Sequence, residues 1–340
     1  MILSLNIGSS TVKFGLFRCG PDPPRAADAV CRGTILSGAL PVRRVFDEIR
    51  SQIGNLEIEA IGHRIVFGGE RHIAPERVTP ALLADLEGFI PLMPLHLPGE
   101  IAFVREASAS FRDVPQVACF DTAFHAGMPA IAKRIPIPRA LWHDGVQRYG
   151  YHGLSYEFIV YQLGADVTGR TIIAHLGNGA SLAAVRDGKP IETTMGLSAL
   201  GGLMMGTRPG DLDPGVILYL IGQGLNVDSI RTLLDEQSGL LGVSETSSDV
   251  ENLLALRAND ERAAEALELF VYTARKHVGA LAAVLGGIDR LIFTGGIGEH
   301  AVPIRDAIAE GIVPMDRVRV IPTDEDLMIA RHTHRVLGST

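Results

Sequence analysis

The chain has 340 residues, of which 46% are hydrophobic and 21% are charged, and its formal net charge at pH 7 is −8. At this length we expect two domains, and the negative charge argues against a nucleic-acid-binding protein, which needs a basic face. No apolar stretch is long enough to cross a membrane, and no signal peptide is expected. Cys19, Cys31 and Cys119 form neither a CxxC pair nor a metal-binding spacing, so a reduced, cytoplasmic setting fits best.

The first half of the chain predicts strands and helices in alternation. Residues 2–7 alternate as a strand, Gly8-Ser9-Ser10 is a turn, and residues 11–17 return as a second strand. Because a strand follows the turn, this is not the strand–turn–helix of a Rossmann or P-loop site. The later predicted elements are a helix at 41–53, a strand at 58–65, helices at 80–89 and 98–111, and a strand at 116–120.

A similar strand–turn–strand unit opens the second half. Residues 170–175 and 181–186 are predicted strands joined by Gly177-Asn178-Gly179. Asn6 and His175 hold equivalent places, so we infer two structurally related halves, with chance likeness between two hairpins as the alternative. The later elements are a helix at 260–285, a strand at 291–294, a glycine turn at 295–298, a helix at 302–310, a strand at 318–321 and a helix capped by Asp324. The predicted class is α/β.

Two glycine-rich segments each contain one arginine. Arg64 lies in Gly62–Glu70 (GHRIVFGGE), and Arg208 lies in Gly206–Pro214 (GTRPGDLDP). Glycine lets a ligand approach the backbone, and the guanidinium fork fits carboxylate and phosphate oxygens. We expect the two arginines to converge on a small anion in a cleft. Glycine turns after strands favour phosphate binding, although each one alone could be an ordinary tight turn.

Other polar residues are candidates because of their place beside turns or strand ends. Lys13 could contact phosphate or could be a solvated strand lysine. Asp121 ends an apolar strand and is either functional or a helix cap. Three histidines that adjoin glycine or proline could face a cleft, namely His96, His152 and His175. The remaining histidines considered are interpreted as surface residues: His72, His143, His277, His332 and His334.

Several segments together resemble one family. They are MILSLNIGSSTVKFGLF, GHRIVFGGE, PLHLP, FDTAFH, RYGYHGLS, HLGNGAS, GLMMGTRPGDLDP, FTGGIGE and IPTDEDLMIAR. The order of these segments is similar to that in acetate kinases and related short-chain carboxylate kinases. The resemblance covers nearly the whole chain. It implies two duplicated actin-like ATPase (ribonuclease H-like) domains with an interdomain cleft, at residues 1–150 and 151–340, with the C-terminal helix packing back on the first domain.

The resemblance also implies an activity and a set of partners. The activity is reversible transfer of a phosphoryl group from ATP to acetate, which gives acetyl phosphate and ADP and feeds acetyl-CoA synthesis. It implies Mg²⁺ or Mn²⁺ as cofactor, a cytoplasmic homodimer, and neither nucleic acid nor membrane as partner. A carboxylate nucleophile is already ionised at neutral pH, so we expect Asp121 to orient Arg64 or a metal-bound water rather than to abstract a proton.

Site residues follow from the matched motifs. The implied catalytic residues are Asp121, His152 and Arg208, and the implied metal ligands are Asn6 and Glu325. The implied carboxylate-binding residues are Arg64, Val66, Leu95 and His96. The implied nucleotide-binding residues are Lys13, His175, Leu176, Gly177, Asn178, Gly179, Asp249, Val250, Glu251, Gly296, Ile297, Gly298, Glu299 and His300.

Departures from the family pattern leave alternatives open. Ala199 replaces a usual proline, which favours propionate or a longer acid such as butyrate. Leu97 replaces a usual asparagine. Glu251 and His300 replace a usual arginine and asparagine, which makes another phosphoryl donor, such as pyrophosphate, an alternative. The chain is also shorter than typical members. A nucleotide-binding sensor or chaperone-like ATPase on the same fold is a further alternative, against which Arg64, Arg208 and Asp121 argue together.

Overall fold

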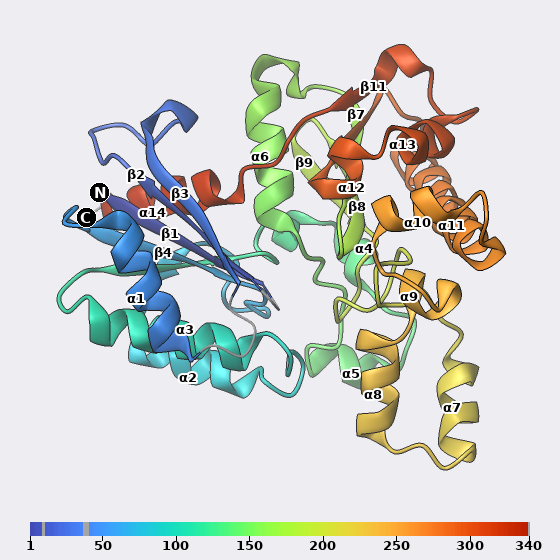
Figure 1. Cartoon of the computed structure of the whole chain (residues 1–340), viewed down its shortest axis with the longest axis horizontal. Helices are drawn as coiled ribbons and strands as arrows, with labels where there is room; N and C mark the ends of the chain where they lie inside the picture. The colour runs from blue at the N-terminus through green and yellow to red at the C-terminus, as the bar shows by residue number, and fades with distance from the viewer. Residues whose placement is uncertain (9–10, 37–40, 339–340) are drawn as a thin grey trace. The chain divides into compact units, whose positions relative to one another are not determined.

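The chain forms two compact units in this computed structural model, which describes residues 1–8, 11–36 and 41–338 (Figure 1). Unit 1 comprises Met1–Ala126, Tyr151–Phe158 and Asp324–Thr340, and unit 2 comprises Gly127–Gly150 and Ile159–Thr323. The domain boundary between residues 150 and 151, which was inferred from the family resemblance, stays a prediction. Among the described residues, every helix is too short or too polar to traverse a bilayer.

The sheet of unit 1 has six strands in the order β3-β2-β1-β4-β6-β5. β1 pairs antiparallel with β2 and parallel with β4, and β4 pairs parallel with β6. The predicted hairpin is present, but its turn residues Ser9 and Ser10 lie outside the described part of the chain. The strands are β1 (Ile2–Ile7), β2 (Thr11–Phe17), β3 (Ala29–Leu36), β4 (Ala60–Ile65), β5 (Glu76–Arg77) and β6 (Gln116–Phe120).

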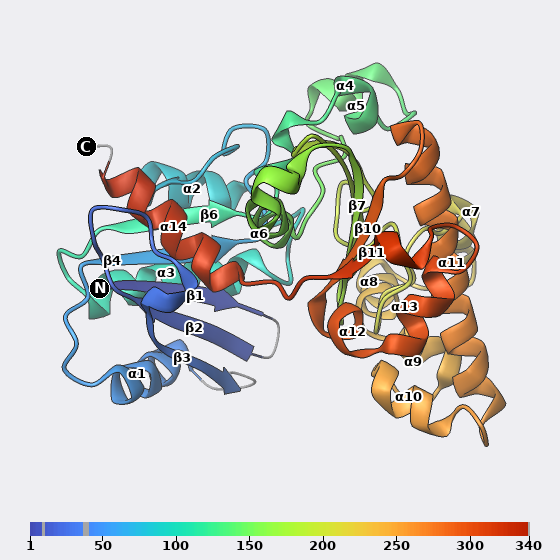
Figure 2. The same cartoon turned by 90° about the horizontal axis from the view of Figure 1, so that it is seen from above.

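Helices cover both faces of this sheet. Successive side chains along each strand point to opposite faces, and both faces carry residues that need cover. In β4, Ile61 belongs to the apolar cluster that includes Phe46 and Phe103, whereas a side chain on Gly62 would collide with Thr333 and Ile329. Figure 2 shows α14 lying along β1 and β4. The helices are α1 (Val42–Ile53), α2 (Pro80–Gly88), α3 (Leu97–Ser110) and α14 (Glu325–Gly338), with the first part of α6 (Gly153–Leu163).

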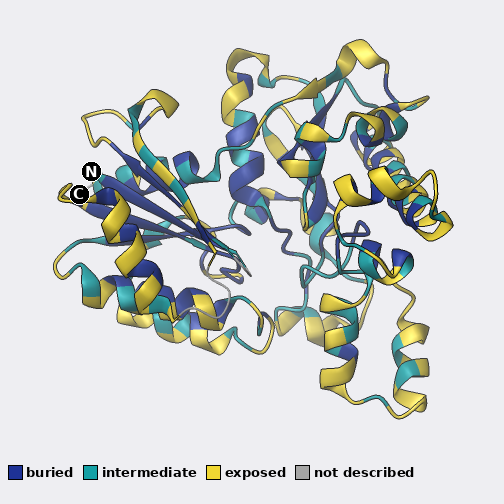
Figure 3. Ribbon diagram, viewed as in Figure 1, coloured by how far each residue is buried: buried dark blue, intermediate teal, exposed yellow. Residues whose placement is uncertain are grey.

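The sheet of unit 2 has five strands in the order β11-β10-β7-β8-β9. Its strands are β7 (Arg170–Leu176), β8 (Ala180–Arg186), β9 (Lys189–Thr193), β10 (Arg290–Thr294) and β11 (Val318–Val320). Its helices are α4 (Ala130–Lys133), α5 (Arg139–His143), α7 (Pro214–Gly222), α8 (Val227–Glu236), α9 (Gly239–Ser244), α10 (Val250–Leu256), α11 (Glu261–Leu285), α12 (Gly295–His300) and α13 (Val302–Ala309). Figure 3 shows buried strands and largely exposed α7 and α8.

Apart from β5, the two sheets share one topology, which supports the predicted duplication. In each sheet the first three strands form an antiparallel meander, and two later strands add in parallel beside the first strand. The hairpin registers differ by one residue, since Asn6 pairs with Lys13, seven positions later, whereas His175 at the equivalent place pairs with Ser181, six positions later.

One local prediction in unit 2 is wrong. Gly295–Gly298 is not a free turn but the first part of α12, which begins directly after β10. Gly295 has a φ of 77°, and a side chain there would meet the Leu176 carbonyl oxygen at 2.7 Å. The glycine therefore permits an immediate strand-to-helix reversal.

Candidate functional site

A buried ion pair lies at the ends of three strands in unit 1. Arg64 Nη2 and Nε donate to Asp121 Oδ2 at 2.6 and 3.0 Å, and Arg64 Nη1 donates to the carbonyl oxygen of Ile7 at 3.1 Å. The Asp121 side chain is fully buried, and that of Arg64 is 14% exposed. Burial raises the pKa of Asp121, while Arg64 opposes this shift. Asp121 thus makes the contact with Arg64 that is expected if it orients the guanidinium.

His152 lies beside this pair because the backbone forces it there. Gly153, the first residue of α6, donates its N–H to the Asp121 carbonyl oxygen at 2.9 Å. A side chain at Gly153 would approach that oxygen to 2.1 Å. His152 has a φ of 59°, a left-handed conformation that costs energy in a non-glycine residue. The sequence therefore keeps His152 close to Asp121 at the expense of local strain.

An acidic group adjoins the pair at the start of α14. Asn6 Nδ2 donates to Glu325 Oε2 at 2.7 Å, so the two implied metal ligands are in contact. Asp326 Oδ1 is buried without a hydrogen-bond partner. Burial, Glu325 and Asp324 raise the pKa of Asp326 to about 7, against Arg32 and Lys13.

These oxygen ligands and the surplus of negative charge suit a hard divalent cation. Mg²⁺ is usually held by only one or two carboxylates together with waters. The described residues contain no group of three or more His, Cys, Asp and Glu side chains arranged as a metal site.

Of the residues implied for substrate binding, Val66 lies at the same strand end. Val66 is buried and follows β4, while Leu95 is 50% exposed and His96 precedes the first residue of α3. The backbone N–H of Val66 donates to Glu100 Oε2 at 3.0 Å. Glu100, in the first turn of α3, was missed at the sequence level. An acidic residue in a first helical turn is common at the surface, and nothing local signals its burial.

A cavity of about 790 Å³ lies in unit 2. Eight of the residues implied for nucleotide binding line it: Gly177, Asn178, Asp249, Val250, Glu251, Gly296, Ile297 and His300. Ser248, Leu254, Ala301 and Pro303 complete the lining and were not predicted. Asp249 caps α10 by accepting from the Asn252 N–H at 2.9 Å. The volume and the mostly apolar wall are typical of a small-molecule site.

The other implied nucleotide residues lie elsewhere. Lys13 is exposed on β2 of unit 1, while His175 and Leu176 belong to β7. Gly179 closes the β7–β8 turn, and Gly298 packs inside α12 near Phe293. Glu299 Oε1 accepts from the backbone N–H groups of Gly295 and Thr323, at 3.0 and 3.2 Å. Glu299 thus holds the start of α12 in place.

The loop that carries Arg208 is fastened to the Gly177–Gly179 turn. Gly206 N–H donates to the Asn178 carbonyl oxygen at 3.1 Å, and a side chain at Gly206 would reach Asn178 Oδ1 at 2.2 Å. Arg208 Nη1 donates to the Ala199 carbonyl oxygen at 2.7 Å. Arg64 and Arg208 belong to different units, so their convergence stays a prediction.

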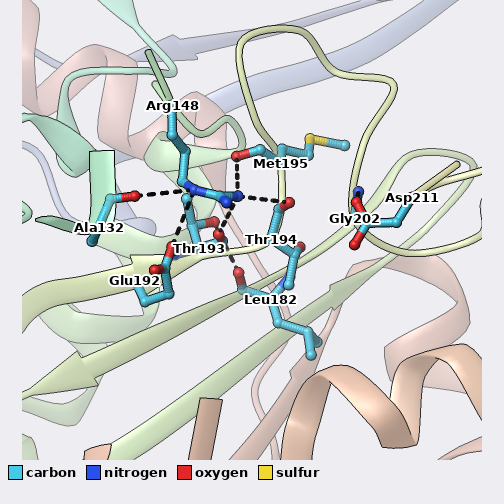
Figure 4. Close-up of polar contacts among 9 residues, drawn as sticks. All are labelled: Ala132, Arg148, Leu182, Glu192, Thr193, Thr194, Met195, Gly202 and Asp211. Carbon is cyan, nitrogen blue, oxygen red and sulfur yellow. Dashed lines mark hydrogen bonds and ion pairs between the residues drawn. The ribbon is translucent and has the colours of Figure 1, made fainter. Parts of the chain in front are cut away.

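Arg148 links the segment 127–150 to the strand and loop at 192–195 of the same unit, as Figure 4 shows. Its guanidinium donates to four backbone carbonyls, those of Ala132, Thr193, Thr194 and Met195, and pairs with Glu192 at 3.3 Å. Beside it, Asp211 Oδ1 accepts from the Gly202 N–H at 2.7 Å. These contacts fix both ends of the loop that contains Ala199.

Two histidines interpreted as surface residues are buried, which corrects the prediction. His72 is flanked by Glu76 at 2.6 Å and Asp85 at 3.3 Å. His332, on α14, pairs through Nε2 with Glu157 on α6 at 2.7 Å. Carboxylate partners make burial of these side chains tolerable: Glu76 is near His72 in sequence, whereas Glu157 is far from His332.

The model of the acetokinase family matches residues 32–316 of the chain. The chain belongs to the acetokinase family. An acetate kinase of Rhodopseudomonas palustris is 41% identical, over 99% of this chain and 98% of the relative. That match spans 395 aligned positions, more than the 340 residues of this chain, so the relative contains insertions that the chain lacks.

Solved structures of acetokinase-family enzymes have the same fold. A propionate kinase of Francisella tularensis subsp. tularensis superposes with a TM-score of 0.87 at 34% identity, covering 98% of this chain and 99% of that one. The acetate kinase of Porphyromonas gingivalis superposes with a TM-score of 0.84 at 32% identity, covering 99% of each chain. These matches confirm the family resemblance and the predicted class of two duplicated actin-like ATPase domains.

Substitution of Gly153 by alanine tests the packing behind His152. Because the new methyl group would overlap the Asp121 carbonyl, we expect Gly153→Ala to lower the free energy of unfolding by about 2 kcal/mol or more. Urea unfolding measures this. The matched control is Gly279→Ala in α11, where a methyl group meets nothing within 4 Å and a gain of about 0.5–1 kcal/mol is expected. Equal effects of the two substitutions would contradict the packing.

Proposed function

We propose that the chain transfers the γ-phosphoryl group of ATP to acetate, reversibly, giving acetyl phosphate and ADP. The buried pair Arg64–Asp121 carries this proposal, since it presents an oriented guanidinium at the carboxyl ends of parallel strands, where ligands of α/β sheets bind. Membership in the acetokinase family and the names of the relatives support it. We further propose a cytoplasmic setting, for which the three free cysteines, Cys19, Cys31 and Cys119, are suited.

The acid substrate needs a positively charged group to bind it rather than a base to deprotonate it. Its carboxyl group has a pKa of about 4, so at neutral pH it is a carboxylate, which is already a nucleophile. Arg64 would hold this carboxylate, and Asp121 would keep the guanidinium in position. Val66 and Leu95 would surround the alkyl end, and His96 would also contact the substrate.

Phosphoryl transfer places negative charge on the equatorial oxygens, so catalysis depends mainly on position and countercharge. Arg208 and His152 would supply donors to the moving group. Asn6 and Glu325 would hold Mg²⁺, directly or through water, and the bound ion would neutralise phosphate charge. The acidic group around Glu325 and Asp326 fits such an ion, as described above.

The cavity of unit 2 favours a nucleotide over pyrophosphate as the phosphoryl donor. Its volume of about 790 Å³ far exceeds the size of pyrophosphate, and its wall includes Val250, Leu254 and Ile297. No lysine or arginine is among the described residues that line it. A nucleoside, with a planar apolar base, suits this wall better than an isolated polyanion does.

Propionate is the second candidate substrate. Ala199 has a small side chain, and its carbonyl oxygen holds Arg208 at 2.7 Å, next to the residue proposed to act on the phosphoryl group. The Francisella tularensis structure to which this chain is similar is a propionate kinase. A short-chain carboxylate is the acceptor in either case.

Formation of acyl hydroxamate tests the proposed reaction directly. With Mg²⁺, hydroxylamine and saturating ATP, we expect hydroxamate from acetate and a lower yield from propionate and butyrate. Pyrophosphate in place of ATP should give none. Binding of nucleotide without hydroxamate from any of the three acids would support a sensor or chaperone-like ATPase instead, and higher kcat/KM for propionate would reassign the acid.

Single arginine substitutions separate the two proposed binding functions. Arg208→Ala should lower kcat by about 10²–10³, because the donor acts mainly in the transition state. Arg64→Ala should instead raise KM for the acid, because that contact also exists in the ground state. Arg71→Ala, which removes an arginine 67% exposed near Arg64 in sequence, is the control and should leave both constants unchanged. A loss below tenfold for Arg208→Ala would refute its assignment.

We also propose that the protein is a homodimer through α7. None of the residues of this helix is buried, although Val216, Leu218, Tyr219 and Ile221 make it strongly apolar. Leu218 is 71% exposed and Tyr219 is 63% exposed. A contiguous apolar surface of this kind is typical of a protein interface, and a second copy of the chain is the partner that the family resemblance implies.

Introducing charge on α7 should separate the copies. We expect Leu218→Glu combined with Ile221→Glu to convert a dimer into a monomer in sedimentation-velocity experiments, because two carboxylates would be buried in the interface. The control is Ile131→Glu, at an apolar position that is 83% exposed on α4 and should leave the dimer intact. A monomeric wild-type protein, or a dimer that survives both glutamates, would contradict this interface.

A further inference from the structure

Glu100 is a buried carboxyl group that binds the backbone two residues beyond the proposed acid-binding Arg64 and interacts electrostatically with that arginine. Its side chain projects from the first turn of α3 and is 1% exposed. One oxygen, Oε2, accepts from the Val66 N–H at 3.0 Å, whereas Oε1 is buried and has no hydrogen-bond partner. A buried carboxylate with an unused oxygen is costly, and neutralising it by a proton removes most of that cost.

The charges around Arg64 are unbalanced. Burial alone would lower the pKa of Arg64, but Asp121, Glu325 and Glu100 together raise it. Three carboxylates therefore act on one guanidinium, before any substrate is present. A carboxylate substrate would add a fourth negative charge, and this charge is unfavourable unless a positive charge enters with it.

Glu100 is well placed to accept that charge as a proton. Burial raises its pKa to about 7, against the effects of Arg64 and the Val66 N–H, while Asp121 raises it further. A group that titrates near neutral pH changes its protonation when a nearby charge appears. Asp121 is less available because its Oδ2 accepts two hydrogen bonds from Arg64, although its Oδ1, like Glu100 Oε1, is buried without a hydrogen-bond partner.

We propose that Glu100 is a positioning residue that takes up one proton from solvent when the carboxylate substrate binds Arg64, so that acid and proton enter the site together. The uptake leaves a neutral Glu100 carboxyl group beside a guanidinium that can then attract the substrate. The inference rests on the proposed function, since it takes Arg64 as the acid-binding residue. It assigns to the site a linkage between proton and substrate that the family match does not specify.

The other charged groups near α3 do not account for this linkage. Arg64 and Asp121 are the charged groups that act on Glu100. The helices packed on α3 carry charged side chains, but none of them shifts the pKa of Glu100: Arg43, Arg44, Asp47, Glu48 and Arg50 on α1, and Asp85 and Glu87 on α2. Asp326 also has a pKa of about 7, so the test must distinguish it from Glu100.

The sign of the expected effect follows from the raised pKa. Glu100 is protonated below pH 7 and ionised above it, so acid binding should weaken as the pH rises. If Glu100, with a pKa of about 7, is fully protonated in the complex, KM for acetate should rise about fivefold between pH 7 and 8, at saturating ATP and Mg²⁺. Glu100→Gln, which is neutral at every pH, should keep KM low and nearly constant over this range. Glu106→Gln, on the same helix, is the control and should retain the wild-type profile.

A second measurement is independent of any variant. Calorimetry of acetate binding to the wild-type protein at pH 7.5, in buffers of different ionisation enthalpy, should show net uptake of about 0.8 proton per acid bound. A KM that does not change with pH, or binding without proton uptake, would overturn the inference even though hydroxamate still forms. If Glu100→Gln keeps the pH dependence, the proton goes to another group and Glu100 is excluded. Absence of hydroxamate at every pH would instead refute the proposed function.

Discussion

The ion pair between Arg64 and Asp121 is the interaction on which the candidate site depends. A guanidinium and a carboxylate removed from water are unfavourable unless each neutralises the other. Here the pair connects the end of β4 to the end of β6, and Arg64 also binds the Ile7 carbonyl at the end of β1. Because these strands are parallel neighbours, their carboxyl ends meet at one edge of the sheet. The sheet topology therefore brings the Arg64 and Asp121 side chains together, and their burial keeps them paired.

The same topology carries different groups in each unit. At the edge of the unit 1 sheet they are charged side chains, including Arg64, Asp121 and Glu325. In unit 2 the corresponding first strand ends in the Gly177–Gly179 turn, and β10 runs directly into α12, so the cavity is lined largely by backbone and apolar groups. The charged edge suits a small anion and a cation, while the glycine-lined cavity suits a larger ligand that approaches the backbone.

Much of the fold could be predicted from periodicity, because its strands and helices are strongly patterned. The predicted helix at 260–285 and strand at 116–120 agree closely with α11 and β6. β3 was missed because its residues alternate only between half-buried and exposed along most of its length. The start of α12 was missed because glycines usually end helices rather than begin them.

The site was predictable only where family motifs or strand ends marked it. Glu100, Arg148 and His332 were missed or misread because their partners are far away in the sequence: Glu100 acts on Arg64, Arg148 binds carbonyls at 193–195, and His332 pairs with Glu157. Such contacts arise from the tertiary fold, and no local propensity encodes them. The charge balance around Arg64 was therefore invisible until the side chains were placed.

That balance changes how the site must be understood. An anion-binding site usually has a surplus of positive charge, yet here Asp121, Glu325 and Glu100 all act on one guanidinium. The surplus is negative, and in a buried setting it weakens the attraction for any further anion. If Arg64 binds the acid as proposed, the site would hold it well only when positive charge arrives as well, as a cation near Glu325 or as a proton on Glu100. The excess of carboxylates would then link occupation by the acid to the presence of the other components of the reaction, so that the acid alone would be held weakly.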